Sequence, residues 1–148
     1  MTEVHRFALV EYRPEQMFDL VCDVRRYPRF LDWVRSADVH EQTDEVQIAS
    51  LAVTLGGIRA RFTTQNRLVR PERIDLTLRE GTFEDLRGCW QFAAVGHGTR
   101  VSLDLDFRFS GSALMRPFRR SFARMADRMV DDFCRRADAV YGSSVCAG

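Results

Sequence analysis

The 148-residue sequence lacks the short motifs that mark the common enzyme classes. It contains no GxGxxG, Walker or GxSxG arrangement, no CxxC pair among its four cysteines, and no two of its three histidines at metal-site or triad spacing. We therefore expect no catalytic residues, no cofactor, no metal, and a structural role for each histidine. Cysteines that are so widely separated indicate small buried hydrophobes in a reducing compartment.

Lysine is also missing, and all 22 basic residues are arginine, which we attribute to genome composition. The net charge of only +1 argues against a general nucleic-acid binder, so we expect no DNA partner. No apolar run approaches the ~20 residues of a transmembrane helix, and the N-terminus has no apolar signal core. These absences favour a soluble cytoplasmic protein.

What the sequence does contain is a change of hydrophobic period along the chain. Apolar residues recur at helical spacing over residues 112–141, whereas residues 34–110 alternate with period 2. A first strand is expected over residues 4–12, and Pro14 suits the first turn of a short helix after it. The expected turns between later strands lie at residues 43–45, 56–57, 70–72, 81–82 and 96–98. Strands joined by such short loops form an antiparallel meander.

The last helix has a wide apolar stripe, so something large must cover it. The strand-rich region before it is the only sizeable partner in the sequence. We therefore predict an α+β fold in which a curved antiparallel sheet of about seven strands surrounds one long C-terminal helix. At this length the chain is one domain, which we expect over residues 1–142, with a flexible tail over residues 143–148.

Several segments resemble the RatA-type START-like family. The matching residues are Ala8-Leu9-Val10, Tyr12, residues 14–21, Asp23-Val24, Tyr27-Pro28, Phe30-Leu31, Trp33, Gly57-Ile58, Phe62-Thr63-Thr64, Asn66, residues 86–92 and residues 133–142. The resemblance spans nearly the whole chain and implies the helix-grip (START/Bet v 1-like) fold of the polyketide cyclase and lipid-transport superfamily. Members of the family include bacterial ribosome-association toxins and a mitochondrial ubiquinone-binding chaperone. Asp32, Val34 and Thr82 depart from its usual pattern.

The resemblance implies a ligand cavity between the sheet and the last helix. In it, Asn66 and Thr64 would offer hydrogen-bond donors to the carbonyls of a quinone, and Gly88 would leave room beside Trp90 for a flat ring. The alternative is a hydrogen-bonded core asparagine and ordinary packing around the tryptophan. Residues 27–33, bulky and aromatic around a proline, form either a lid or a plug. The expected ligand-binding residues are Tyr27, Phe30, Leu31, Trp33, Phe62, Thr64, Asn66, Leu86, Gly88, Trp90, Phe92, Phe122, Met125 and Met129.

Positive charge gathers on the last helix. Residues 1–111 carry 15 Arg against 17 acids, whereas residues 112–148 carry seven Arg against four Asp. Such clusters suit the phosphates of rRNA or of anionic lipid headgroups, although a helix face of this kind is also often merely solvated. The expected surface-interaction residues are Arg116, Arg119, Arg120 and Arg124.

With the resemblance, these features predict a non-enzymatic protein that binds a hydrophobic ligand, ubiquinone or a related polyprenyl lipid, and that supports respiration or quinone synthesis. Its partners would be components of those systems, with peripheral contact to a membrane. Two alternatives stay open. The first is a RatA-like toxin that binds the large ribosomal subunit and blocks subunit association. The second is an aromatic polyketide cyclase, which would need a titratable group inside a polar cavity.

Overall fold

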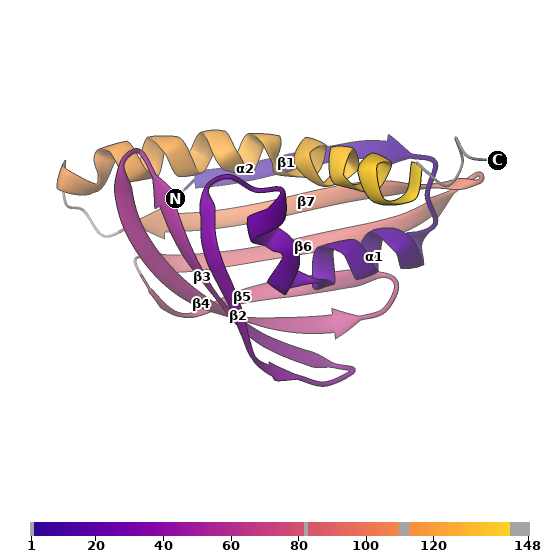
Figure 1. The fold of residues 1–148 in the computed structure, drawn as a ribbon, viewed down its shortest axis with the longest axis horizontal. Helices are drawn as coiled ribbons and strands as arrows, with labels where there is room; N and C mark the ends of the chain where they lie inside the picture. The colour runs from indigo at the N-terminus through magenta and orange to yellow at the C-terminus, as the bar shows by residue number, and fades with distance from the viewer. Residues whose placement is uncertain (1, 82, 110–112, 143–148) are drawn as a thin grey trace.

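The computed structural model describes residues 2–81, 83–109 and 113–142 and shows one curved sheet with helices on its concave side (Figure 1). The strands are β1 Thr2–Val10, β2 Val34–Gln42, β3 Val46–Leu55, β4 Ile58–Val69, β5 Arg73–Gly81, β6 Phe83–Val95 and β7 Gly98–Phe109. The α-helices are α1 Pro14–Cys22 and α2 Arg116–Ala137, with short helical turns η1 Val24–Arg29, η2 Ala113–Met115 and η3 Asp138–Gly142. The predicted helix start at Ser112, Thr82 of one predicted turn, and the predicted tail lie outside the described residues.

The sheet is an antiparallel meander that β1 extends at one edge. Its strand order is β1-β7-β6-β5-β4-β3-β2, and each neighbouring pair is antiparallel. Between β3 and β4, Gly56 and Gly57 both have positive φ, 59° and 76°, which glycine adopts without strain. The seven strands and the long C-terminal helix confirm the predicted α+β helix-grip fold.

Helix α2 lies along β1 and β7 and turns its apolar stripe toward the sheet (Figure 1). Its buried residues are Phe118, Phe122, Met125, Ala126, Val130, Phe133 and Ala137. The α-helix is shorter than the predicted span of residues 112–141. It begins at Arg116 because Pro117, which has no N–H to donate, fits only a first turn, and it ends in the π-helical turn η3.

The first strand also ends earlier than predicted, at Val10 instead of Tyr12. The pairing of β1 with β7 stops where Val10 faces Thr99. Beyond that point the Thr99 hydroxyl donates to the Tyr12 carbonyl at 2.6 Å, so a side chain replaces the strand ladder. The chain can then turn into α1.

Two aromatic clusters fill the ends of the space between α2 and the sheet. In the first, the Phe83 ring lies 4.5 Å from that of Phe109 and 4.8 Å from that of Phe122, measured between ring centroids. The members of this cluster are Phe62, Phe83, Phe107, Phe109, Phe118 and Phe122. The second surrounds Phe133, whose ring contacts those of Tyr27, Phe30 and Trp90 at 5.2–5.3 Å.

The aromatic segment over residues 27–33 packs into the core and closes the concave side near η1. Tyr27 is 6% exposed and its hydroxyl donates to the Val21 carbonyl at 2.5 Å. Leu31 is 1% exposed and Trp33 is 6% exposed. The segment is held to the sheet by the Thr54 N–H, which donates to the Trp33 carbonyl at 2.9 Å. In this structure the segment therefore acts as a plug.

Candidate ligand-binding cavity

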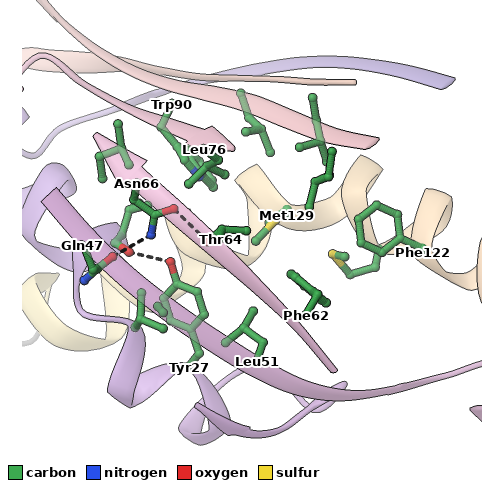
Figure 2. Close-up of a pocket in the computed structure, with 18 of the residues that line it drawn as sticks. Tyr27, Gln47, Leu51, Phe62, Thr64, Asn66, Leu76, Trp90, Phe122 and Met129 are labelled. Carbon is green, nitrogen blue, oxygen red and sulfur yellow. Dashed lines mark hydrogen bonds between the residues drawn. The ribbon is translucent and has the colours of Figure 1, made fainter. Parts of the chain in front are cut away.

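A cavity of about 80 Å³ lies between the two aromatic clusters, bounded by the sheet, α2 and η1. Figure 2 shows most of the side chains around it, with Gln47 and Asn66 at one end and Phe122 at the other. The lining residues are Val21, Val24, Tyr27, Trp33, Gln47, Ala49, Leu51, Phe62, Thr64, Asn66, Ile74, Leu76, Leu86, Trp90, Leu103, Leu105, Phe122, Met125 and Met129. The wall is thus almost wholly apolar, with a single polar end.

The polar end is a chain of side-chain hydrogen bonds on β3 and β4 (Figure 2). The Thr64 hydroxyl donates to Asn66 Oδ1 at 2.8 Å, and Asn66 Nδ2 donates to Gln47 Oε1 at 2.8 Å. Gln47 Nε2 in turn donates to the Cys22 carbonyl and to Gln42 Oε1, each at 2.8 Å. Asn66 is 4% exposed and Gln47 is 2% exposed, so these bonds offset the cost of burying two amides.

These hydrogen bonds determine which donors remain for a ligand in the cavity. The Thr64 hydroxyl proton is already committed to Asn66, so the prediction that Thr64 offers a donor to a ligand does not fit the geometry. Asn66 carries two amide hydrogens, and its bond to Gln47 uses one of them. The arrangement therefore holds the Asn66 amide in a fixed orientation, with one N–H beyond those that the hydrogen-bond chain uses.

Gln47 is a lining residue that the sequence analysis missed, although the sequence contains a signal for it. The tight turn at Gly56 and Gly57 sets the β3–β4 register, and that register places Gln47 directly opposite Asn66. Counting back from the turn would have identified the pair. Strand β3 hid it because both of its faces are largely apolar, so no alternation is visible. The other residues missed are the small and aliphatic ones of the lining: Val21, Val24, Ala49, Leu51, Ile74, Leu76, Leu103 and Leu105.

The structure brings ten of the fourteen expected ligand-binding residues to this cavity. These are Tyr27, Trp33, Phe62, Thr64, Asn66, Leu86, Trp90, Phe122, Met125 and Met129. The other four lie elsewhere. Phe30 packs against Phe133 and under the guanidinium of Arg136, Phe92 packs between Trp90 and Phe18, and Leu31 is buried in the core.

Gly88 is the fourth, and the prediction of open space beside it is wrong. A Cβ at this position would lie 2.8 Å from Leu105 Cδ1 and 3.4 Å from Leu76 Cδ1. The two leucines of the neighbouring strands occupy the space that was expected to hold a flat ring. Gly88 therefore allows close side-chain packing between strands.

Within the part of the chain that the structure describes, Tyr27 is the only ionisable side chain that lines the cavity. Burial raises the pKa of its phenol well above the ordinary value, and the hydroxyl donates to a backbone carbonyl, so it stays neutral at physiological pH. No group of metal-ligating side chains occurs among the described residues either. Among the described lining residues, no side chain is therefore ionised near neutral pH in a way that would let it act as an acid or base.

The four predicted surface arginines lie on the N-terminal half of α2. Arg116, Arg120 and Arg124 are exposed and Arg119 is half-buried. No ion pair joins any of the four to a described residue, and the carboxylate of Asp127 is bound by Arg6 of β1 at 3.1 Å. This half of the helix therefore carries positive charge that its surroundings do not neutralise.

Comparison with known proteins identifies a family and several relatives of this chain. A family model described as polyketide cyclase / dehydrase and lipid transport matches residues 10–134. The chain is 40% identical over 142 residues to the ribosome association toxin RatA of Pseudomonas aeruginosa PAO1, which covers 95% of this chain and 99% of that protein. It is 31% identical over 103 residues to the mitochondrial coenzyme Q-binding protein COQ10 of Drosophila melanogaster, covering 69% of this chain and 43% of that protein.

Solved structures show the same fold at lower identity. A START superfamily protein from Mycobacterium smegmatis matches with a TM-score of 0.77 and 16% identity, covering 93% of this chain and 98% of that one. The Zhui aromatase/cyclase from Streptomyces sp. R1128 matches with a TM-score of 0.80 and 15% identity, covering 93% of each chain. At such identities the likeness concerns the fold alone. Among the described helices, none has the length and apolar character needed to cross a membrane.

Proposed function

The chain belongs to the polyketide cyclase / dehydrase and lipid transport family, and from that premise we propose that it is a non-enzymatic binding protein for a polyprenyl quinone or a related polyprenyl lipid. The observation that carries the proposal is the cavity, an apolar hollow with one oriented amide at its end. The Drosophila relative named for coenzyme Q binding adds weight to a quinone as the ligand.

The cavity suggests how such a ligand would lie. The remaining N–H of Asn66 donates to a quinone carbonyl at the polar end, and the isoprenoid chain runs along the aliphatic strand residues toward α2. Each CH₂ group removed from water contributes about 0.8 kcal/mol, so most of the affinity comes from the chain and the amide selects the head. Sequestration of this kind needs no catalytic group, and this agrees with the described part of the cavity wall, where the one ionisable side chain is a neutral phenol.

The ligand requires the cavity to widen. Its volume is about 80 Å³, whereas sites for molecules of drug size usually enclose roughly 300–1,000 Å³. Met125 and Met129 of α2 line the cavity, and methionine changes rotamer at little cost. Movement of these side chains and of the plug over residues 27–33 would admit the ligand.

Titration with a short-chain ubiquinone tests the proposal. Replacing Asn66 by leucine removes the donor and should weaken quinone binding by roughly 3–10-fold, the range for one hydrogen bond, while an isoprenoid hydrocarbon of similar size binds as before. Gln65→Leu is the matched control, because Gln65 is exposed and adjacent on β4. Failure of the folded wild-type protein to bind either compound would reject the proposal.

A second candidate function is association with the large ribosomal subunit. The relative at 40% identity is named a ribosome association toxin, and the arginines of α2 suit a phosphate backbone. If this surface is used, co-sedimentation with large subunits should fall steeply with salt and should be lost when Arg116, Arg120 and Arg124 are all changed to glutamine. Unchanged sedimentation of the triple variant would remove this candidate.

The described cavity residues do not favour the cyclase alternative. The likeness to the Zhui aromatase/cyclase concerns the fold, and cyclase chemistry needs an acid or base at the substrate. The only ionisable side chain on the described cavity wall is Tyr27, which is held neutral by burial and by its bond to Val21.

A further inference from the structure

A second hollow lies directly beside the cavity. It is a surface groove of about 640 Å³ between the residues before β2, the β3–β4 turn and the middle of α2. Figure 1 shows this turn reaching up to the first half of α2. Trp33 and Met125 line both the groove and the cavity, so these two side chains form the partition between them.

The frame around this partition is fixed at two points. The backbone of Trp33 is hydrogen-bonded to Thr54 of β3 at 2.9 Å. On the other side, Gly56 is pressed onto α2, since a Cβ there would lie 2.3 Å from the Pro117 carbonyl oxygen. Between these two points of contact, the partition consists of the Met125 side chain and the indole of Trp33. The indole Nε1 is buried and has no hydrogen-bond partner among the described residues.

The groove is also rich in donors. Arg124, Arg128 and Ser121 of α2 line it, next to the tryptophan. Neither arginine forms an ion pair with a described residue. Of the two lining acids, Asp127 already accepts two hydrogen bonds from Arg6, at 3.1 and 3.3 Å, which leaves Asp32 as the only carboxylate not bound in this way. Two guanidinium groups beside one free carboxylate favour an anion with several oxygens.

From this juxtaposition we propose that the groove is a headgroup subsite for a phosphate ester attached to an apolar chain. The phosphate lies against Arg124 and Arg128, and the chain passes between Trp33 and Met125 into the cavity. A neutral quinone would use only the inner hollow, whereas a polyprenyl phosphate would use both. The inference rests on the proposed function, because the cavity must accept the apolar chain.

Trp33 is a built-in reporter for the test. The sequence has only two tryptophans, so Trp90→Phe leaves Trp33 as the sole emitter at the partition. This variant is titrated with farnesyl diphosphate, farnesol and inorganic diphosphate. We expect farnesyl diphosphate to bind at least about 10-fold more tightly than farnesol, as for hydrogen bonds to a charged group, and to shift the Trp33 emission.

Two arginine pairs separate the groove from general attraction to a basic helix. Arg124→Gln with Arg128→Gln should reduce the affinity for farnesyl diphosphate to that for farnesol. Arg116→Gln with Arg120→Gln removes the same charge from the same helix outside the groove and should change the affinity less than about 2-fold. Equal affinities for farnesyl diphosphate and farnesol, or equal losses in the two double variants, would overturn the subsite.

The three probes give different results for failure of the groove subsite and for failure of the cavity. If farnesol binds and the diphosphate adds nothing, the subsite fails and the cavity stands. If inorganic diphosphate binds as tightly as farnesyl diphosphate and farnesol does not bind, the linked site and the cavity proposal both fail. Vesicles with and without phosphatidylglycerol identify the source of the phosphate: pelleting that needs Arg124 and Arg128 indicates a membrane headgroup, and binding of farnesyl diphosphate alone indicates a soluble ester.

Discussion

Replacing Ala49 by leucine distinguishes a hollow from a packed core. Ala49 lies in the middle of β3, is 4% exposed and lines the cavity opposite Thr64. A leucine at this position points its extra carbons into the empty volume. If the volume is a real cavity the side chain fills it, and if the core were tightly packed the side chain would have no room.

The magnitude follows from the cavity volume. Cavities in protein cores cost ~24 cal/mol per Å³, so filling about 80 Å³ recovers at most about 2 kcal/mol. For a domain of this size that corresponds to a rise in melting temperature of roughly 4–8 °C. Overpacking a filled core would instead cost about 1–3 kcal/mol. The two cases therefore differ in sign as well as in size.

The assay combines thermal unfolding with quinone titration. We expect Ala49→Leu to be as stable as the wild-type protein or more so, and to bind quinone at least 10-fold more weakly because its site is occupied. Ala52→Leu is the matched control, since Ala52 lies on the same strand with its side chain on the opposite face, outside the cavity. A variant at position 49 that is destabilised by more than about 1 kcal/mol and still binds quinone normally would show that this volume is not the quinone site.

Three further predictions concern the frame, the hydrogen-bond chain and the thiols. Gly56→Ala should lower the free energy of unfolding by about 3–5 kcal/mol, whereas Gly57→Ala should lower it by only about 1–2 kcal/mol, because only the first substitution pushes a Cβ into α2. Urea unfolding measures both losses, and equal losses would contradict this prediction. Gln47→Leu should cost about 2–4 kcal/mol, because Asn66 Nδ2 and the Cys22 carbonyl each lose the hydrogen bond that Gln47 forms with them; a loss below ~0.5 kcal/mol in the same assay would show that these hydrogen bonds are not buried. Burial raises the pKa of Cys89 to about 12, and iodoacetamide reacts with the thiolate form of cysteine. At pH 8 the alkylation of Cys89 should therefore be slower in the folded protein than in the unfolded protein by a factor of at least about 100. Similar rates in the two states would contradict the burial of this thiol.

The sequence predicted the fold well because the strands after β3 have one wet face. The alternation over residues 101–109 and 58–68, the paired glycines at 56 and 57, and the wide stripe of α2 each point to the same architecture. Element ends were less certain. The start of α2 depends on Pro117, and the end of β1 depends on the hydrogen bond from the Thr99 hydroxyl to the Tyr12 carbonyl. The hydrophobic period of a sequence does not reveal such local features.

The candidate site was only partly predictable, for physical reasons. Inward parity identified Asn66 and Trp90, because parity is a property of one strand. The space beside Gly88 depends on leucines of two neighbouring strands, which parity does not reveal. The groove needs Trp33, Gly56 and Arg124, residues far apart in the sequence, to meet, and no local pattern predicts that meeting.

We propose that the hollow between the sheet and α2 holds a polyprenyl ligand. The most direct measurement is to purify the protein without detergent, extract it with organic solvent and identify the extract by mass spectrometry. We expect a quinone or another isoprenoid lipid in stoichiometric amount from the wild-type protein, and little or none from Ala49→Leu. An empty extract from well-folded wild-type protein that also takes up no added quinone would contradict it.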